Sequence, residues 1–145
     1  MPKPEIHKMS FAYRSPLIYI DLDKFEPIND TYGHNVGDLY LQEVALRMSR
    51  QLLGHDMLAR MGGDEFAALV SLSNGLADLD RIVARLEHCF DRPFAVGGYL
   101  LNGSASIGVA LYPEDGATKD SLLSAADAAM YAVKNKKHKI EGSLA

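Results

Sequence analysis

The feature that most constrains the fold of this chain is a pair of short apolar runs joined by a glycine-rich turn. Residues 57–61 and 66–72 both have the length and composition of strands. Between them, Gly62-Gly63-Asp64-Glu65 is typical of the tight turn of a β-hairpin. The sequence therefore predicts an antiparallel strand pair in the middle of the chain.

Other segments show the same alternation of strand-like and helix-like patterns. Apolar runs predict strands at residues 17–22 and 104–112, with a weaker hairpin at 94–101 around Gly97-Gly98. Apolar residues at helical spacing predict helices at 41–52, 76–90 and 122–133. The predicted order is β-α-α-β-β-α-β-β-α. It favours an α/β (α+β) sandwich with a central, mostly antiparallel sheet flanked by helices.

Polar residues and glycines set the predicted limits of the early helices. A short helical turn is expected after the first strand, ending near Asn29-Asp30. The next helix is expected to have Asp38 at its start, where a carboxylate favours the helix dipole, and to end at Gly54.

Length and composition predict one soluble domain. The chain has 145 residues, without the run of about 18 apolar residues that a membrane span requires and without a signal peptide at its start. We therefore expect a cytoplasmic protein. Residues 1–15 are predicted to be a tail or linker, residues 16–140 the domain, and residues 141–145 a C-terminal tail.

Charge and cysteine content narrow the classes of ligand. The net charge of −4 argues against a nucleic acid polymer as partner. A small phosphorylated ligand needs only a local cluster of cations, and residues 134–139 form one. Cys89 is the single cysteine, which excludes an internal disulfide or a thiolate metal cluster.

Carboxylates occupy the ends of two predicted strands. Asp21 ends the first strand, and Asp64 and Glu65 lie at the hairpin tip. If the hairpin pairs beside the first strand, these side chains converge at one sheet edge. Oxygens of this kind suit Mg²⁺ together with phosphate oxygens of a substrate. Solvated caps at strand ends and turns are the alternative reading of the same residues.

The motifs together resemble the GGDEF family of diguanylate cyclases. Residues 62–66 read Gly-Gly-Asp-Glu-Phe, and residues 21–34 read Asp-Leu-Asp-Lys-Phe-Glu-Pro-Ile-Asn-Asp-Thr-Tyr-Gly-His. Gly37-Asp38, the late-strand residues 106–110 and the last-helix residues 126–134 extend the resemblance from about Leu17 to Lys134. It implies the palm-like (ferredoxin-like) fold of nucleotidyl cyclases and the condensation of two GTP into cyclic di-GMP by a transient homodimer.

The resemblance also implies roles for the carboxylate residues. Asp21 and Asp64 would hold Mg²⁺ or Mn²⁺ with help from the backbone carbonyl of Leu22, and Glu65 would support the metal site. Asp64, Glu65 and Asp21 are thus the candidate catalytic residues, and Gly62, Gly63 and Phe66 complete the signature turn.

A second set of residues is implied to bind the nucleotide. Asn29 and Asp38 would hydrogen-bond the guanine edge, backbone groups around Lys24 and Phe25 would meet the phosphates, and Lys134 would add a positive charge there. Without the resemblance, Asn29 is a turn former, Asp38 a helix-start carboxylate and Lys134 a cation near a helix C-terminus.

Four departures from the family pattern bear on activity. Residues 1–16 lack the family's opening motif, and Glu26 stands where the family has lysine. His138, between Lys137 and Lys139, replaces a usual cation. Leu53 replaces the arginine of a product-binding motif that retains Asp56, so we do not expect tight product inhibition there.

Two functions remain open at this point. The first is an active diguanylate cyclase, favoured by the intact signature. The second is a degenerate module that binds GTP, or nothing, and controls an attached partner such as an EAL-type phosphodiesterase, with a sensory domain as a further possible attachment. Glu26, His138 and the absent opening motif favour the second.

Overall fold

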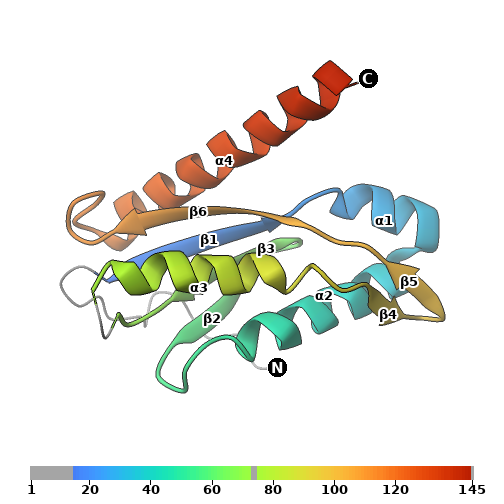
Figure 1. Ribbon diagram of the computed structural model, residues 1–145, viewed down its shortest axis with the longest axis horizontal. Coiled ribbons are helices and arrows are strands. Elements are labelled where there is room, and N and C mark those ends of the chain that lie inside the picture. The colour runs from blue at the N-terminus through green and yellow to red at the C-terminus, as the bar shows by residue number, and fades with distance from the viewer. Residues whose placement is uncertain (1–14, 73–74, 145) are drawn as a thin grey trace.

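A computed structural model describes residues 15–72 and 75–144. The elements follow one another in the order β1 (Pro16–Leu22), α1 (Phe25–Tyr32), α2 (His34–Ser49), β2 (Met57–Gly62), β3 (Glu65–Leu69), α3 (Ala77–His88), β4 (Phe94–Val96), β5 (Tyr99–Leu101), β6 (Ala105–Leu111) and α4 (Lys119–Leu144) (Figure 1).

Four strands form the central sheet in the order β2-β3-β1-β6, and all neighbouring pairs are antiparallel. The strands β4 and β5 form a separate hairpin. The predicted fold class is confirmed. The predicted order has one strand too few after α3, because the hairpin at residues 94–101 contributes two strands.

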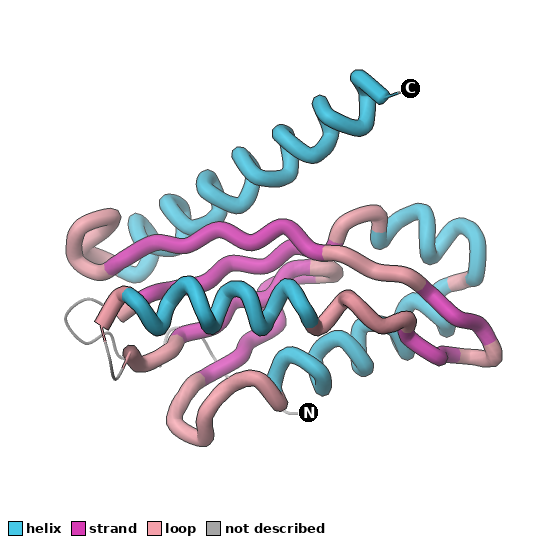
Figure 2. Tube along the Cα trace, viewed as in Figure 1, coloured by secondary structure: helices cyan, strands magenta, loops and turns pink. Residues whose placement is uncertain are grey.

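Helices cover both faces of the sheet, which is why β1 is buried along its whole length. Alternate residues of a strand point to opposite faces. One set in β1 packs with α2 and α3, and the other set packs with α4. Figure 2 shows the strands between these layers, with α1, the hairpin and the start of α2 together at one end.

The contact between α4 and β6 is unusually close. A β-carbon on Gly108 would lie 2.1 Å from the backbone nitrogen of Met130. Glycine at this position therefore allows the helix backbone to lie directly on the strand. Met130, Ala126 and Leu122 bury the inner face of the same helix.

The predicted limits of two helices are wrong. α2 begins at His34 and ends at Ser49, so Asp38 lies in its second turn and the helix stops before Gly54. Its polar first turn carries too little apolar pattern to be recognised. α4 continues through residues 134–144, beyond the predicted end at 133, because the apolar stripe marks burial and the later turns rise away from β6 (Figure 1).

The terminal predictions fall partly outside the described residues. Residues 1–14 of the predicted N-terminal tail lie outside them, and residues 141–144 of the predicted C-terminal tail belong to α4. Among the helices that the structure describes, none combines the length and apolarity that crossing a membrane demands.

Candidate functional site

The carboxylates at the strand ends meet at one end of the sheet. Asp21 of β1 lies between Glu65 of β3 and Ser106 of β6 in the strand register. The backbone N–H of Leu22 donates a hydrogen bond to the carbonyl of Asp64 at 3.0 Å. The hairpin pairs beside the first strand, and its tip is therefore fastened to the end of β1.

Asp21 is buried but incompletely bonded. Its residue is 6% exposed, and Oδ2 accepts a hydrogen bond from Nζ of Lys134 at 2.5 Å. The other carboxylate oxygen, Oδ1, is buried without a hydrogen-bond partner among the described residues. Burial raises the pKa of Asp21 to about 6, and the nearby charges of Asp64 and Glu65 add to the effect while Lys134 opposes it.

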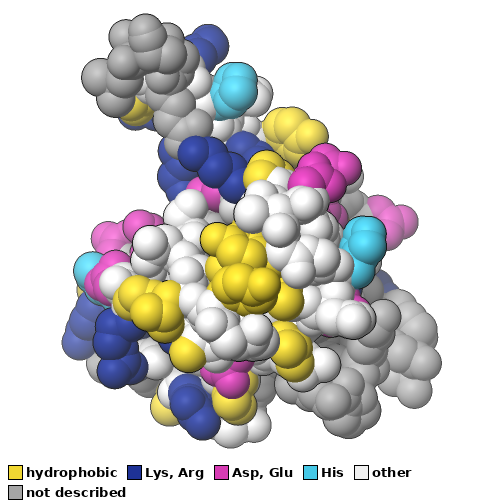
Figure 3. All heavy atoms as spheres, turned by 90° about the vertical axis from the view of Figure 1, so that its right-hand side faces the viewer, with side chains coloured by type: hydrophobic (Ala, Val, Ile, Leu, Met, Phe, Trp, Pro, Cys, Tyr) yellow, Lys and Arg dark blue, Asp and Glu magenta, His cyan; other side chains and the backbone are white. Residues whose placement is uncertain are grey.

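Lys134 contacts two atoms that matter for a metal site. Besides Oδ2 of Asp21, its ammonium lies 3.5 Å from the carbonyl oxygen of Leu22. Burial alone would lower the pKa of Lys134, but the hydrogen bond to Asp21 and the surrounding carboxylates raise it overall. Figure 3 shows Lys and Arg side chains gathered where α4 leaves the body of the molecule.

Asp23 forms a second, fully bonded carboxylate two residues later. It accepts hydrogen bonds from Ser106 at 2.7 Å, Ser104 at 2.8 Å and Lys137 at 3.0 Å. These bonds outweigh its burial and lower the pKa of Asp23. Sequence reasoning missed this cluster. The spacing of Lys134 and Lys137, three residues apart, was its available signal, since such residues share a helix face.

Two more residues support the hairpin tip and were also missed. Tyr19 donates a hydrogen bond from its hydroxyl to Oε2 of Glu65 at 2.8 Å. Burial, and then this bond, raise the pKa of Tyr19. Arg60 donates from Nη2 to the carbonyl of Gly63 at 2.9 Å and from Nε to that of Gly62 at 3.1 Å. The turn is thereby held on both sides.

The predicted nucleotide side lies on α1 and α2. Lys24 precedes α1 in the left-handed region, at φ 57°, so the chain turns sharply at the predicted phosphate-binding position. Phe25 begins α1 and stacks on the buried Tyr40 at 6.4 Å between ring centroids. The stacked rings of Phe25 and Tyr40 therefore support this turn.

Asn29 has a buried oxygen without a partner. Its Oδ1 accepts no hydrogen bond within the described residues, and it lies over Gly37, where a β-carbon would come within 1.8 Å. Asn29 lies inside α1, so the prediction that it forms a turn is wrong. Asp38 lies in the second turn of α2, so the prediction that it starts the helix is also wrong. Asp38 is exposed.

The two substitutions that weaken the family pattern are both on the surface. Glu26 is exposed in the first turn of α1, where a negative charge favours the helix dipole. His138 is exposed on α4, whereas its neighbour Lys137 reaches Asp23 and the carbonyl of Ala105. The extra cation at this end of the sheet is therefore Lys137.

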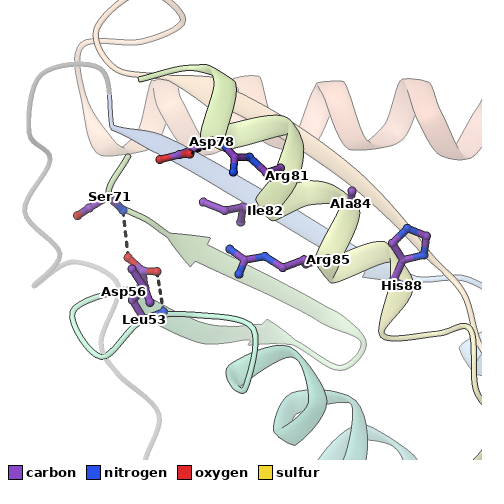
Figure 4. A pocket seen from close by; sticks show the side chains of 9 residues that line it. All are labelled: Leu53, Asp56, Ser71, Asp78, Arg81, Ile82, Ala84, Arg85 and His88. Atoms are coloured by element: carbon purple, nitrogen blue, oxygen red, sulfur yellow. Dashed lines mark hydrogen bonds and ion pairs between the residues drawn. The ribbon is translucent and has the colours of Figure 1, made fainter. Parts of the chain in front are cut away.

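Asp56 lies at the opposite end of the sheet, beside a hollow of about 430 Å³. Its two oxygens accept the backbone N–H groups of Leu53 at 2.9 Å and Ser71 at 3.0 Å (Figure 4). Arg81 and Arg85 of α3 line the same hollow. Asp56 therefore acts as a structural cap for these two backbone N–H groups.

The donor set at Asp21 fits a hard divalent cation. No three His, Cys, Asp or Glu side chains within residues 15–72 and 75–144 converge into a complete metal-binding group. Asp21 and Asp64 would instead share the ion with the Leu22 carbonyl, water and phosphate oxygens, as Mg²⁺ usually requires. The unpaired Oδ1 of Asp21 supports this fit.

Comparison with protein families gives a match over most of the chain. The family model described as "Diguanylate cyclase, GGDEF domain" matches residues 4–139. This match starts within residues 1–15, which the sequence assigned to a tail. It also includes the carboxylate end of the sheet and Lys134 and Lys137 of α4.

Individual relatives are similar over the same region. The chain is 42% identical over 122 residues to the bifunctional diguanylate cyclase/cyclic di-GMP phosphodiesterase MucR of Pseudomonas aeruginosa, covering 84% of this chain and 18% of MucR. It is 41% identical to the diguanylate cyclase TpbB of the same species, covering 81% of this chain and 27% of TpbB. The chain thus spans about a quarter or less of these two relatives.

Solved structures agree with the fold. The crystal structure of the GGDEF domain of TpbB matches with a TM-score of 0.82 at 39% identity, covering 86% of this chain and 78% of that domain. An EAL/GGDEF domain protein from M. capsulatus matches with a TM-score of 0.80 at 34% identity, covering 86% of this chain and 81% of that one.

Proposed function

The chain belongs to the GGDEF family of diguanylate cyclases, and from this premise we propose that it condenses two GTP into cyclic di-GMP with release of two pyrophosphates. The observation that carries the proposal is the convergence of Asp21, Asp64 and Glu65 at one sheet end, with Oδ1 of Asp21 buried and unpaired. An unpaired buried carboxylate oxygen is costly and is best accounted for by a missing cation.

Each side chain then has a task. Asp21 and Asp64, with the Leu22 carbonyl, hold Mg²⁺ or Mn²⁺, and Tyr19 holds Glu65 beside them. When bound, the ion would neutralise charge on the phosphates and acidify the attacking hydroxyl. Lys24 and Phe25 present backbone groups to the phosphates at the sharp turn before α1.

Asn29 and Asp38 are proposed to select guanine. A carboxylate accepts from the N1 and N2 hydrogens of guanine, and an amide both donates and accepts. The partnerless Oδ1 of Asn29 supports this role because it is an acceptor in need of a donor. Adenine would leave these groups unpaired, so ATP should be excluded.

The reaction requires two copies of the domain. The 3′-hydroxyl of each GTP attacks the α-phosphorus of the other, forming two phosphodiester bonds and breaking two bonds to pyrophosphate. One domain with one GTP provides half of this arrangement, so we propose a transient homodimer. Because GTP is an intracellular substrate, we place the domain in the cytoplasm.

The alternative is a regulatory module attached to an EAL-type or sensory domain. Glu26 and His138 favour it, since each removes a positive charge that the family pattern offers to the phosphates. A related protein that is 39% identical over 118 residues is named cyclic di-GMP phosphodiesterase PdeR, of Escherichia coli. Similar domains thus occur in a protein named for the opposite activity.

The two functions are separated by incubating the chain with GTP and Mg²⁺ or Mn²⁺ and analysing the products by chromatography. A cyclase forms cyclic di-GMP and pyrophosphate, and Asp64→Asn forms neither. If the wild type binds GTP but makes no product in the longest natural form of the protein, the regulatory module is the better assignment.

A further inference from the structure

Lys134 lies where a bound metal would be expected. Its ammonium contacts Oδ2 of Asp21 and the carbonyl oxygen of Leu22, which are two of the three protein groups proposed to hold the ion. Asp64 and Glu65 lie beside Asp21 at this end of the sheet, and within the described residues Lys134 is the cation that pairs with Asp21. In the free protein, Lys134 therefore supplies a positive charge at the proposed metal ligands.

We propose that Lys134 is the resident counter-ion of the metal site, which occupies the place of the metal in the free protein and leaves it when the metal binds. The inference rests on the proposed function and goes beyond it, because it assigns Lys134 a role before any nucleotide is present. Lys134 and the metal then compete for the same atoms of Asp21 and Leu22.

The geometry makes this exchange feasible. The side chain of Lys134 is 32% exposed, whereas that of Asp21 is 9% exposed, so the ammonium closes the open side of the site. A lysine is a point charge on a flexible four-carbon stem and can rotate away without moving its helix. The backbone of α4 beneath it is fixed against β6 at Gly108.

The exchange would couple metal binding to substrate binding. A displaced ammonium is stabilised by a new anion, and the triphosphate provides one beside the same site. Nucleotide binding then removes a competitor of the metal, and metal binding frees a cation for the nucleotide. Coupling of this kind is reciprocal by thermodynamic linkage.

The change in metal affinity after loss of Lys134 separates a counter-ion role from a phosphate-binding role alone. Removing the lysine should strengthen metal binding in the absence of nucleotide. A lysine that only meets phosphate would leave that affinity unchanged. The remaining explanation, a general loss of positive charge, applies equally to other lysines of α4.

The chain offers two matched controls on the same helix. Lys137 bonds to Asp23 in place of Asp21, and Lys136 is exposed, with no hydrogen bond or ion pair within the described residues. Lys134→Met, Lys136→Met and Lys137→Met remove the same charge within one turn of α4. Only Lys134→Met removes a cation from the proposed metal ligands, Asp21 and the carbonyl of Leu22.

The experiment is a titration of nucleotide-free protein with Mn²⁺, followed by electron paramagnetic resonance of the free ion. A pH of 8 keeps the carboxyl of Asp21 ionised after the lysine is removed. We expect Lys134→Met to bind Mn²⁺ about three- to tenfold more tightly than the wild type. Lys136→Met and Lys137→Met should stay within about twofold, because Lys136 is exposed and Lys137 bonds to Asp23 and Ala105 instead of Asp21.

Two further variants complete the design. In an Asp21→Asn background the effect of Lys134→Met should vanish, since the shared ligand is gone. If Lys134→Met does not fold, Lys134→Gln replaces it. Unchanged or weaker Mn²⁺ binding after loss of Lys134, or an equal gain in all three lysine variants, overturns the proposal. Because no GTP is present, this result is independent of whether the chain makes cyclic di-GMP.

Discussion

Asp21 and Asp56 are both nearly buried, at opposite ends of the central sheet, yet they serve different purposes. The side chain of Asp56 is 3% exposed, and both its oxygens accept backbone N–H groups. That of Asp21 is 9% exposed, and one of its oxygens accepts nothing within the described residues. Burial is common to both, so the unsatisfied oxygen is what distinguishes Asp21, which we propose to bind metal, from the structural cap Asp56.

The largest expected effect is on catalysis at the Asp21 end. Asp64→Asn should lower the rate of cyclic di-GMP formation by more than about a hundredfold, because partners one step removed from a metal already contribute 10- to 100-fold. Asp56→Asn should retain activity per folded molecule. Steady-state rates corrected for the folded fraction test this contrast, and comparable losses in both variants would remove the distinction.

The next largest effect is on the free energy of unfolding, and it is expected for Asp56 and not for Asp21. Asp56→Ala removes the acceptor of the backbone N–H groups of Leu53 and Ser71, at a cost of about 1–3 kcal/mol in the free energy of unfolding. Asp21→Asn relieves repulsion from Asp64 and Glu65 and should cost far less. Urea unfolding of both variants measures the difference. Equal destabilisation would mean that Asp21 is also chiefly structural.

Asn29 extends the comparison to the nucleotide side, because its buried oxygen is unpaired like that of Asp21. Asn29→Ala and Asp38→Ala should each weaken GTP binding by about 1–3 kcal/mol, or roughly ten- to a hundredfold. ATP binding should remain weak throughout. Calorimetry with both nucleotides, with the melting temperature as control, tests the pair. Equal affinities of the wild type for GTP and ATP would exclude a guanine pocket.

A smaller effect follows from the pKa of Asp21, which is raised to about 6. The protonated carboxyl does not bind cations, so Mn²⁺ affinity should fall as the pH drops below 6 and level off above about 7. The contribution of Asp21 to folding stability should change with pH in the opposite direction. A raised folded-state pKa stabilises the fold below the unfolded value of 3.8, and this contribution is lost as the pH rises through 6. Asp21→Asn should abolish both trends.

The smallest expected signal is at the Asp56 end. Cyclic di-GMP should bind weakly or not at all there, because Leu53 lacks a cationic group and Asp56 already accepts two backbone N–H groups. Calorimetry with the isolated ligand measures this. A submicromolar affinity that disappears in Asp56→Ala would reverse our assignment of this residue.

Local patterns predicted the sheet and its hairpin, and the convergence of Asp21 with Asp64 followed once the strands were paired. The hydrogen bonds of Asp23 at this site could not be predicted from local patterns. Asp23 meets Ser104 and Lys137 from 81 and 114 residues away. The spacing of Lys134 and Lys137 places them on one helix face but does not show which residues they contact. The extent of α4 was missed for a related reason, because its last turns have no core to face and thus no apolar stripe.

The backbone of α4 lies directly on β6 at the point where Gly108 has no side chain. Met130 lies at that point and Lys134 one turn beyond it, about 6 Å further along the axis. A side chain at Gly108 that lifted the helix from the strand would therefore also displace the ammonium of Lys134 from Asp21.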